Sequence, residues 1–133
     1  MSPLIQTYLA VMLGGALGTG MRMFLAEVMS NRFGESFPWG IIAVNVSGCF
    51  FIGIFSGLTG PDGVFAPSPI TRQVVMVGVL GGYTTFSSFS LRTITLLSEG
   101  EWLYAFGNIS LTVLLCLIGT WGGLVGAGLW QAR

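Results

Sequence analysis

Four long apolar runs, separated by short polar or proline-containing segments, dominate this 133-residue chain. A helix needs about 20 mostly apolar residues to cross the hydrocarbon core of a bilayer. Only 8% of the residues are charged, against about 25% in a typical soluble domain. We therefore predict an all-α membrane protein with one domain, residues 1–133, and four transmembrane helices per subunit. The predicted spans are residues 4 to about 29, 39 to about 58, 70 to about 97 and 102 to about 130.

The connecting segments predict turns rather than further domains. SNRFGESFP, residues 30–38, ends in Pro38, and TGPDGVFAPSP, residues 59–69, contains three prolines and two glycines. Proline and glycine both disfavour the interior of a helix. Because four is an even number of spans, we expect both chain ends on the same side of the membrane.

The charges exclude several classes of function. The chain has five arginines, five acidic residues and no histidine, with a formal net charge of zero. We therefore expect neither a nucleic-acid surface nor a histidine metal site. Arg72 and Arg133 fall on the side of the termini, and Arg22 and Arg32 on the other side, so the arginines set no orientation. A chain without this bias can insert both ways. Together with small residues at helical spacing, which let helices approach closely, this permits an antiparallel homodimer, with packing inside one subunit as the alternative.

Two polar side chains in the first two spans are candidate functional residues, because polar groups inside a membrane usually face an interior or a cavity. Arg22 either extends to the membrane interface or supplies a fixed positive charge in a vestibule for anions. Asn45, six residues into the second span, either bridges helices or lines a pore. Its amide can donate a hydrogen bond to an anion without carrying charge.

The fourth span contains a stripe of small or polar residues, Asn108, Thr112, Cys116 and Thr120, at intervals of four. This spacing places them on one helix face. The stripe predicts either a packing seam or a polar track for an ion. Cys116 and the other cysteine, Cys49, form no disulfide framework and are expected to be small buried hydrophobes.

The third span contains GGYTTFSSFS, residues 81–90. We predict that Gly81-Gly82 breaks the helix, and that non-helical backbone at this depth is buried in protein or lines a cavity. Carbonyl oxygens freed near Gly81 and Thr84 could hold a cation. Phe86 and Phe89, three residues apart, would share a face, and their positively polarised ring edges could face an anion beside hydroxyls such as Ser88.

These motifs resemble the Fluc family of small dual-topology bacterial fluoride channels over essentially the whole chain. GGALGTGMR, residues 14–22, looks like the first-span signature, and PWGIIAVNVSGCFFIG, residues 38–53, like the second-span pattern around the asparagine. GVLGGYTTFSSFS, residues 78–90, is close to the most specific family motif, GGxTTFSTFS.

The resemblance implies a passive exporter of cytoplasmic fluoride in the bacterial inner membrane, in contact with lipid, and not an enzyme. It implies an antiparallel homodimer with two fluoride pores and a structural sodium ion at the dimer interface, held by the backbone carbonyls of Gly81 and Thr84. The pore residues it implies are Asn45, Phe86, Phe89, Ser88, Asn108, Thr112 and Cys116, with Arg22 near the vestibule.

Three positions depart from the family pattern. Ile41 stands where the family usually has threonine, and Ser88 replaces another threonine while keeping the hydroxyl. Arg92 replaces a glutamate, which is a charge reversal expected near the pore mouth. Conductance or selectivity could therefore differ, while the fold is unaffected.

Two other classes of protein have four apolar spans. A small dual-topology multidrug exporter needs a carboxylate in the middle of a span for proton coupling, and the one candidate, Glu27, lies near the end of the first span. A non-conducting structural subunit would leave the hydroxyl and phenylalanine motif without a role.

Overall fold

The computed structural model describes residues 2–132, and within them it contains helices and no strand. Arg133, one of the arginines counted above, lies outside this range, as does Met1. Four stretches are long and apolar enough to cross a membrane, which confirms the prediction of an all-α, four-span chain. The elements are α1 (Pro3–Phe33), α2 (Trp39–Thr59), α3 (Pro69–Gln73), the π-helix η1 (Val74–Leu80), α4 (Gly81–Tyr83), α5 (Phe86–Ser98) and α6 (Trp102–Gln131).

Local sequence explains where the helices begin and end. Ser2 caps α1 by accepting a hydrogen bond from the Ile5 N–H at 3.4 Å, and Ser68 caps α3 by accepting from the Thr71 N–H at 3.2 Å. Gly34 follows α1 with φ 79°, a backbone conformation that favours glycine. The predicted turns at residues 30–38 and 59–69 therefore lie close to the observed helix ends.

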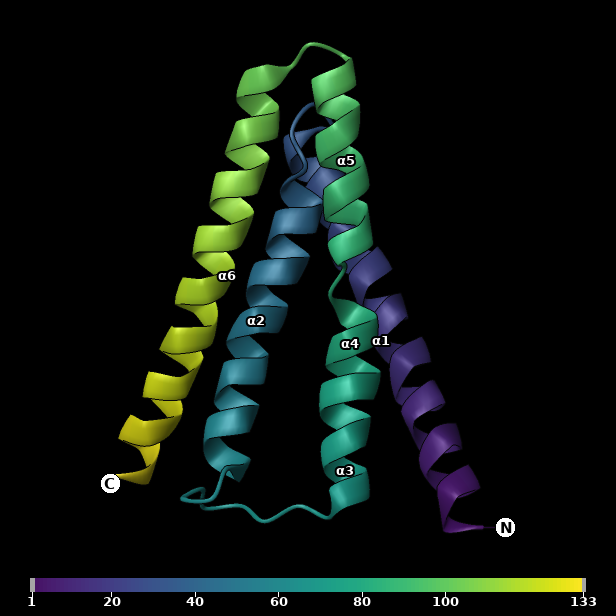
Figure 1. Ribbon diagram of the computed structural model, residues 1–133, viewed down its shortest axis with the longest axis vertical. Coiled ribbons are helices and arrows are strands. Elements are labelled where there is room, and N and C mark those ends of the chain that lie inside the picture. The colour runs from purple at the N-terminus through teal and green to yellow at the C-terminus, as the bar shows by residue number, and fades with distance from the viewer. Residues whose placement is uncertain (1, 133) are drawn as a thin grey trace.

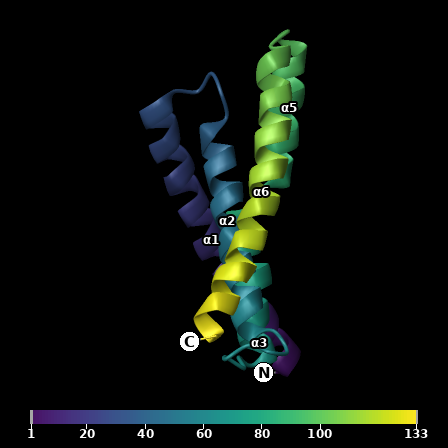
Figure 2. The same ribbon diagram turned by 90° about the vertical axis from the view of Figure 1, so that its left-hand side faces the viewer.

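The helices run alternately up and down, so residues 2 and 132 lie at the same end of the molecule (Figure 1). The loop at residues 60–68 lies at this end, and the loops at residues 34–38 and 99–101 lie at the other end. α2 packs along α6, and α1 packs against η1 and α4. The α1–α2 hairpin leans away from α5 and α6 toward its loop (Figure 2).

Glycines bring the first and third spans into backbone contact. Gly14 and Gly18 are the buried residues of α1. A Cβ atom on Gly14 would lie 3.0 Å from the Val74 carbonyl oxygen, and one on Gly82 would lie 3.0 Å from the Gly15 Cα. Small residues thus allow a close approach inside one subunit, which was the alternative to dimer packing for these glycines.

A second set of glycines joins α2 to α6. A Cβ atom on Gly53 would lie 3.2 Å from the Gly123 Cα, and one on Gly119 would lie 3.2 Å from the Val46 carbonyl oxygen. The two backbones therefore touch at more than one level, which fixes their spacing.

Much of the outer surface consists of large apolar side chains. Leu13, Phe24 and Leu103 are among the most exposed, at 73%, 71% and 82%. In water such a surface would be unfavourable, so it faces lipid or another protein surface in the membrane.

The third span differs from the prediction in the position of its non-helical residues. Gly81, at φ −65° and ψ −38°, is helical. The extended residues are Thr84, with ψ 159°, and Thr85, with φ −149° and ψ 110°. The prediction of a break at Gly81-Gly82 is therefore wrong in position, because Gly82 serves to bring this span against Gly15 of α1 rather than to interrupt it.

Candidate functional site

Asn45 on α2 pairs with both backbone polar groups of Thr85. Its Nδ2 donates to the Thr85 carbonyl at 3.0 Å, and its Oδ1 accepts from the Thr85 N–H at 2.7 Å. In a continuous helix this N–H would donate to the Gly81 carbonyl, four residues earlier. Asn45 thus satisfies both backbone hydrogen-bonding groups of the extended Thr85 from another helix. The Gly81 carbonyl is left without the Thr85 N–H that would be its donor in a continuous helix.

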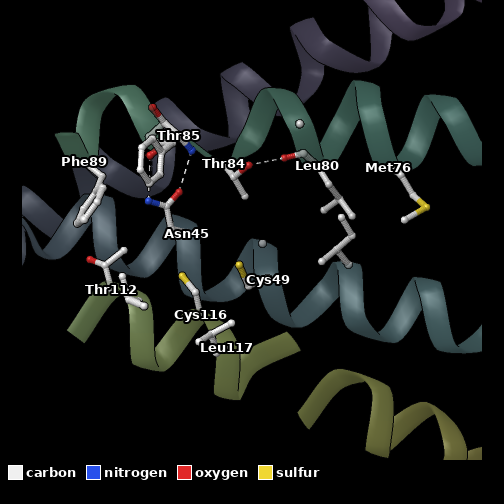
Figure 3. Close-up of a pocket in the computed structure, with 15 residues that line it drawn as sticks. Asn45, Cys49, Met76, Leu80, Thr84, Thr85, Phe89, Thr112, Cys116 and Leu117 are labelled. Carbon is white, nitrogen blue, oxygen red and sulfur yellow. Dashed lines mark hydrogen bonds between the residues drawn. The ribbon is translucent and has the colours of Figure 1, made fainter. Parts of the chain in front are cut away.

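A cavity of about 380 Å³ lies beside this pair, between α2, α6 and the third span (Figure 3). Asn45 and Thr112 project toward it from opposite helices, and Phe89 lies at one end of it. The wall contains no charged side chain from residues 2–132, so the cavity is neutral. The lining residues are Asn45, Gly48, Cys49, Ile52, Met76, Leu80, Gly81, Thr84, Thr85, Phe86, Phe89, Thr112, Val113, Cys116 and Leu117.

Most polar hydrogens of the wall are already engaged. Thr84 Oγ1 donates to the Leu80 carbonyl at 3.1 Å, and Thr112 Oγ1 donates to Asn108 Oδ1 at 3.3 Å. An amide NH2 has two hydrogens, and only one of the Asn45 pair is used by Thr85. The second hydrogen makes Asn45 the side chain best placed to donate to a bound anion.

The two phenylalanines of the motif lie together at the cavity. Their ring centroids are 5.3 Å apart and their planes are inclined by 52°. Phe89 is 7% exposed, whereas Phe86 is 76% exposed. The predicted shared face is therefore present, with one ring inside the subunit and the other open to whatever lies outside it.

The stripe on the fourth span divides into two parts. Thr112 and Cys116 line the cavity, whereas Asn108 is completely buried and its Nδ2 donates to Thr93 Oγ1 at 2.9 Å. Thr120 instead lies at the contact with Gly53. The stripe is thus a packing seam at its two ends and a cavity wall in the middle. Its role as a polar track for an ion stays a prediction.

Ser88 and Arg22 lie close to the extended pair but outside the cavity wall. Ser88 is exposed, and its Oγ accepts from Thr85 Oγ1 at 2.9 Å. Arg22 Nη1 donates to the Thr84 carbonyl over a long 3.4 Å. Its guanidinium is therefore directed toward the third span.

Comparison with known proteins identifies the family. A family profile described as "CrcB-like protein, Camphor Resistance (CrcB)" matches residues 9–124. The chain belongs to this family.

Relatives of this CrcB-like chain align with its sequence over nearly their full length. A fluoride-specific ion channel FluC of Rhodospirillum rubrum is 56% identical over 123 residues, covering 92% of this chain and 95% of the relative. Proteins of the same description from Opitutus terrae and Methylocella silvestris are 48% and 47% identical, covering 92% and 89% of this chain and 93% and 90% of their own. The family resemblance drawn from the motifs is thereby confirmed.

Sequence reasoning missed several wall residues of this CrcB-like chain, including Gly48, Met76 and Leu80. Cys49 was treated only as a buried hydrophobe, yet it lies on the wall and is partly exposed. One signal was present, because Cys49 follows Asn45 by four residues and so shares its helix face.

Proposed function

We propose that this chain is the subunit of a fluoride-selective channel that gives passive export of cytoplasmic fluoride across the bacterial inner membrane. The observation that carries this proposal is the convergence of Asn45, Phe86 and Phe89 on one neutral cavity, in a chain whose relatives are named fluoride-specific ion channels. The function is transport rather than catalysis.

The wall chemistry suits a small anion. The free N–H of Asn45 can donate a hydrogen bond, and aromatic ring edges carry partial positive charge. These donors are worth more inside a low-dielectric cavity than in water. Because they hold no full charge, they replace part of the hydration shell without trapping the ion, as conduction requires.

An antiparallel homodimer with two pores is part of the proposal. Phe86, at 76% exposure, and Gly81, also exposed, lie on the cavity wall and open to the outside of the subunit. A second copy across this surface would cover both and close the cavity. Of the four described arginines, Arg72 lies at the end of the termini, Arg32 and Arg92 lie toward the other end, and Arg22 lies beside Thr84. The proposed dimer therefore rests on the exposed wall residues and not on the arginines.

A structural sodium ion on the dimer axis is the second part. The Thr85 N–H donates to Asn45 instead of to the Gly81 carbonyl. This leaves the Gly81 carbonyl oxygen free, and hard cations prefer oxygen ligands of this type. The lining that contains Gly81 and Thr84 includes no acidic side chain from residues 2–132, so the oxygen set is neutral and suits a monovalent ion. The Thr84 carbonyl fits less well, because Arg22 already donates to it; its second lone pair is available.

The two alternatives find less support. Glu27 is exposed on α1 and is not among the cavity-lining residues, so a proton-coupled exporter would lack a carboxylate at its site. A structural subunit would not need an apolar-walled cavity with one uncommitted donor.

Fluoride efflux from proteoliposomes tests the central proposal. Phe86→Ile and Phe89→Ile should abolish or sharply reduce efflux while the assembly still forms, because each removes a ring edge. Phe24→Ile, at an exposed position on α1, is the matched control and should conduct normally. Full efflux from both motif variants would show that the ring edges are dispensable, and proton-coupled cation exchange would favour the exporter.

The two finer parts have their own tests. Cross-linking should give dimers, and site-specific labelling should find residue 132 on both sides of the membrane; one orientation in every molecule excludes the antiparallel dimer. Efflux should fall after prolonged exchange into rigorously sodium-free solution, and unchanged efflux would exclude the sodium ion.

A further inference from the structure

Two thiols lie near each other in the cavity wall. Cys49 comes from α2 and Cys116 from α6, both are partly exposed, and both line the cavity. Their sulfur atoms project into the same space (Figure 3), and the two side chains are close enough to interact with each other. These are the only cysteines of the chain, which also has no histidine. Every thiol-dependent property of the protein therefore arises here.

The spacing of this pair is set by backbone contact rather than by flexible loops. Gly119, three residues after Cys116, lies against the Val46 carbonyl, and Gly53, four residues after Cys49, lies against Gly123. Sites built on packed helices hold their ligands more closely than sites on loops. The two sulfur atoms are thus preorganised as a pair.

The surrounding groups define which ligand fits. The Met76 thioether lines the same cavity, and the lining contains no carboxylate from the described residues 2–132. Thiolate and thioether sulfur are soft donors that select soft metal ions, whereas carboxylates suit hard cations. Zinc would require four ligands, and the wall offers two thiols.

We propose that Cys49 and Cys116 form a two-thiolate site for a soft d10 cation of the Hg²⁺ class, which binds two sulfur atoms in a linear arrangement. On binding, two S–H bonds break, two S–Hg bonds form and two protons leave to water, with no electron transfer. The product has no net charge, which suits a neutral, mostly apolar cavity because a buried unpaired charge is costly. Ag⁺ or Cu⁺ bound by the same thiolates would leave a net negative charge and should bind less favourably.

Occupancy has a consequence for transport, which rests on the function proposed above. Cys116 lies one helical turn from Thr112 on α6, and Cys49 one turn from Asn45 on α2. A metal ion bridging the two sulfur atoms would fill the space beside the Asn45 amide. Fluoride efflux should therefore fall when the site is occupied.

Metal retention tests the site without relying on transport. Reduced, detergent-purified protein is exposed to HgCl2, challenged with increasing concentrations of a monothiol, and separated by gel filtration before the mercury per chain is measured. The intact protein should retain one mercury per chain and lose both free thiols. Cys49→Ser and Cys116→Ser, which are matched controls for each other, should release mercury at monothiol concentrations at least about tenfold lower, because a tethered second thiol acts at high effective concentration.

Two results would overturn the site. One is two mercury ions per chain in the intact protein, which means that the thiols bind independently and which needs no variant to detect. The other is equal retention by the intact protein and the single-cysteine variants.

An efflux measurement on the same samples separates this inference from the proposed function. Mercury should reduce efflux from the intact protein at least tenfold relative to its own untreated rate, and less in either variant relative to its own. Normal efflux with one mercury retained would overturn the blocking role. Absence of fluoride efflux before treatment would count against the proposed function, while retention would still decide the site.

Discussion

Removal of the Asn45 side chain should destabilise the protein by an amount that can be worked out from its contacts. Asn45→Ala leaves the Thr85 N–H and carbonyl without the partners that now lie 2.7 and 3.0 Å away. Thr85 is buried, and each buried polar group left unpaired costs about 1–3 kcal/mol. The expected loss in the free energy of unfolding is therefore about 2–6 kcal/mol, toward the lower end if water enters from the adjoining cavity.

Denaturant titration in mixed detergent micelles, followed by circular dichroism, measures this loss. Asn31→Ala is the matched control, because Asn31 is exposed near the end of α1 and such substitutions usually change stability by no more than about 0.5 kcal/mol. Hydrogen exchange at Thr85 should also accelerate in Asn45→Ala alone. A stability change in Asn45→Ala no larger than that of the control would refute the view that this side chain holds the extended residues.

Two further predictions concern helix contacts. Gly18→Ala should strongly lower the thermal midpoint in detergent, because its Cβ would collide with backbone of the third span. Gly20→Ala, whose Cβ would have nothing within 4 Å, should leave the midpoint unchanged or raise the free energy of unfolding by up to about 1 kcal/mol. Equal behaviour of the two variants would contradict the close approach. Arg92→Gln should speed hydrogen exchange in loop 34–38, because the guanidinium donates to the Glu35 carbonyl at 2.9 Å. The free energy of unfolding should fall by no more than about 1.5 kcal/mol. Unchanged exchange would show that this hydrogen bond does not order the loop.

Span number and type were predictable because apolar length is a property of the local sequence. Each predicted span lies within one observed stretch, and the deviations are a few residues at helix ends, such as α1 continuing to Phe33 instead of ending near residue 29. Helix ends depend on caps as well as on hydropathy. The φ of Gly34 and the proline-rich loop agree with the turn residues.

The position of the extended pair was not predictable in the same way. Glycine weakens a helix on average, but here Gly82 is helical and permits contact with Gly15. Thr84 and Thr85 leave the helix where Asn45, 40 residues earlier in the chain, satisfies the Thr85 backbone. A contact of this range has no local signal, and the π-helix at Val74–Leu80 also went unpredicted.

The sequence indicated which residues lie together at the candidate site better than it indicated their hydrogen bonds. Asn45, Phe86, Phe89, Thr112 and Cys116, which were predicted as pore residues, line one cavity, and their role in conduction stays a prediction. Motif resemblance could not indicate that Asn108 is instead bonded to Thr93, because this depends on how α5 and α6 face each other.

The two sets of glycine contacts also determine which part of the molecule deforms most easily. One set joins α1 to η1 and α4, and the other joins α2 to α6. Within each of these two pairs of spans the backbones are in contact, and such contacts resist compression. The cavity lies at the boundary between the pairs, where side chains leave about 380 Å³ unfilled. Hydrostatic pressure should therefore narrow this boundary, since pressure acts on void volume, while the levels at which backbone already touches backbone should keep their spacing.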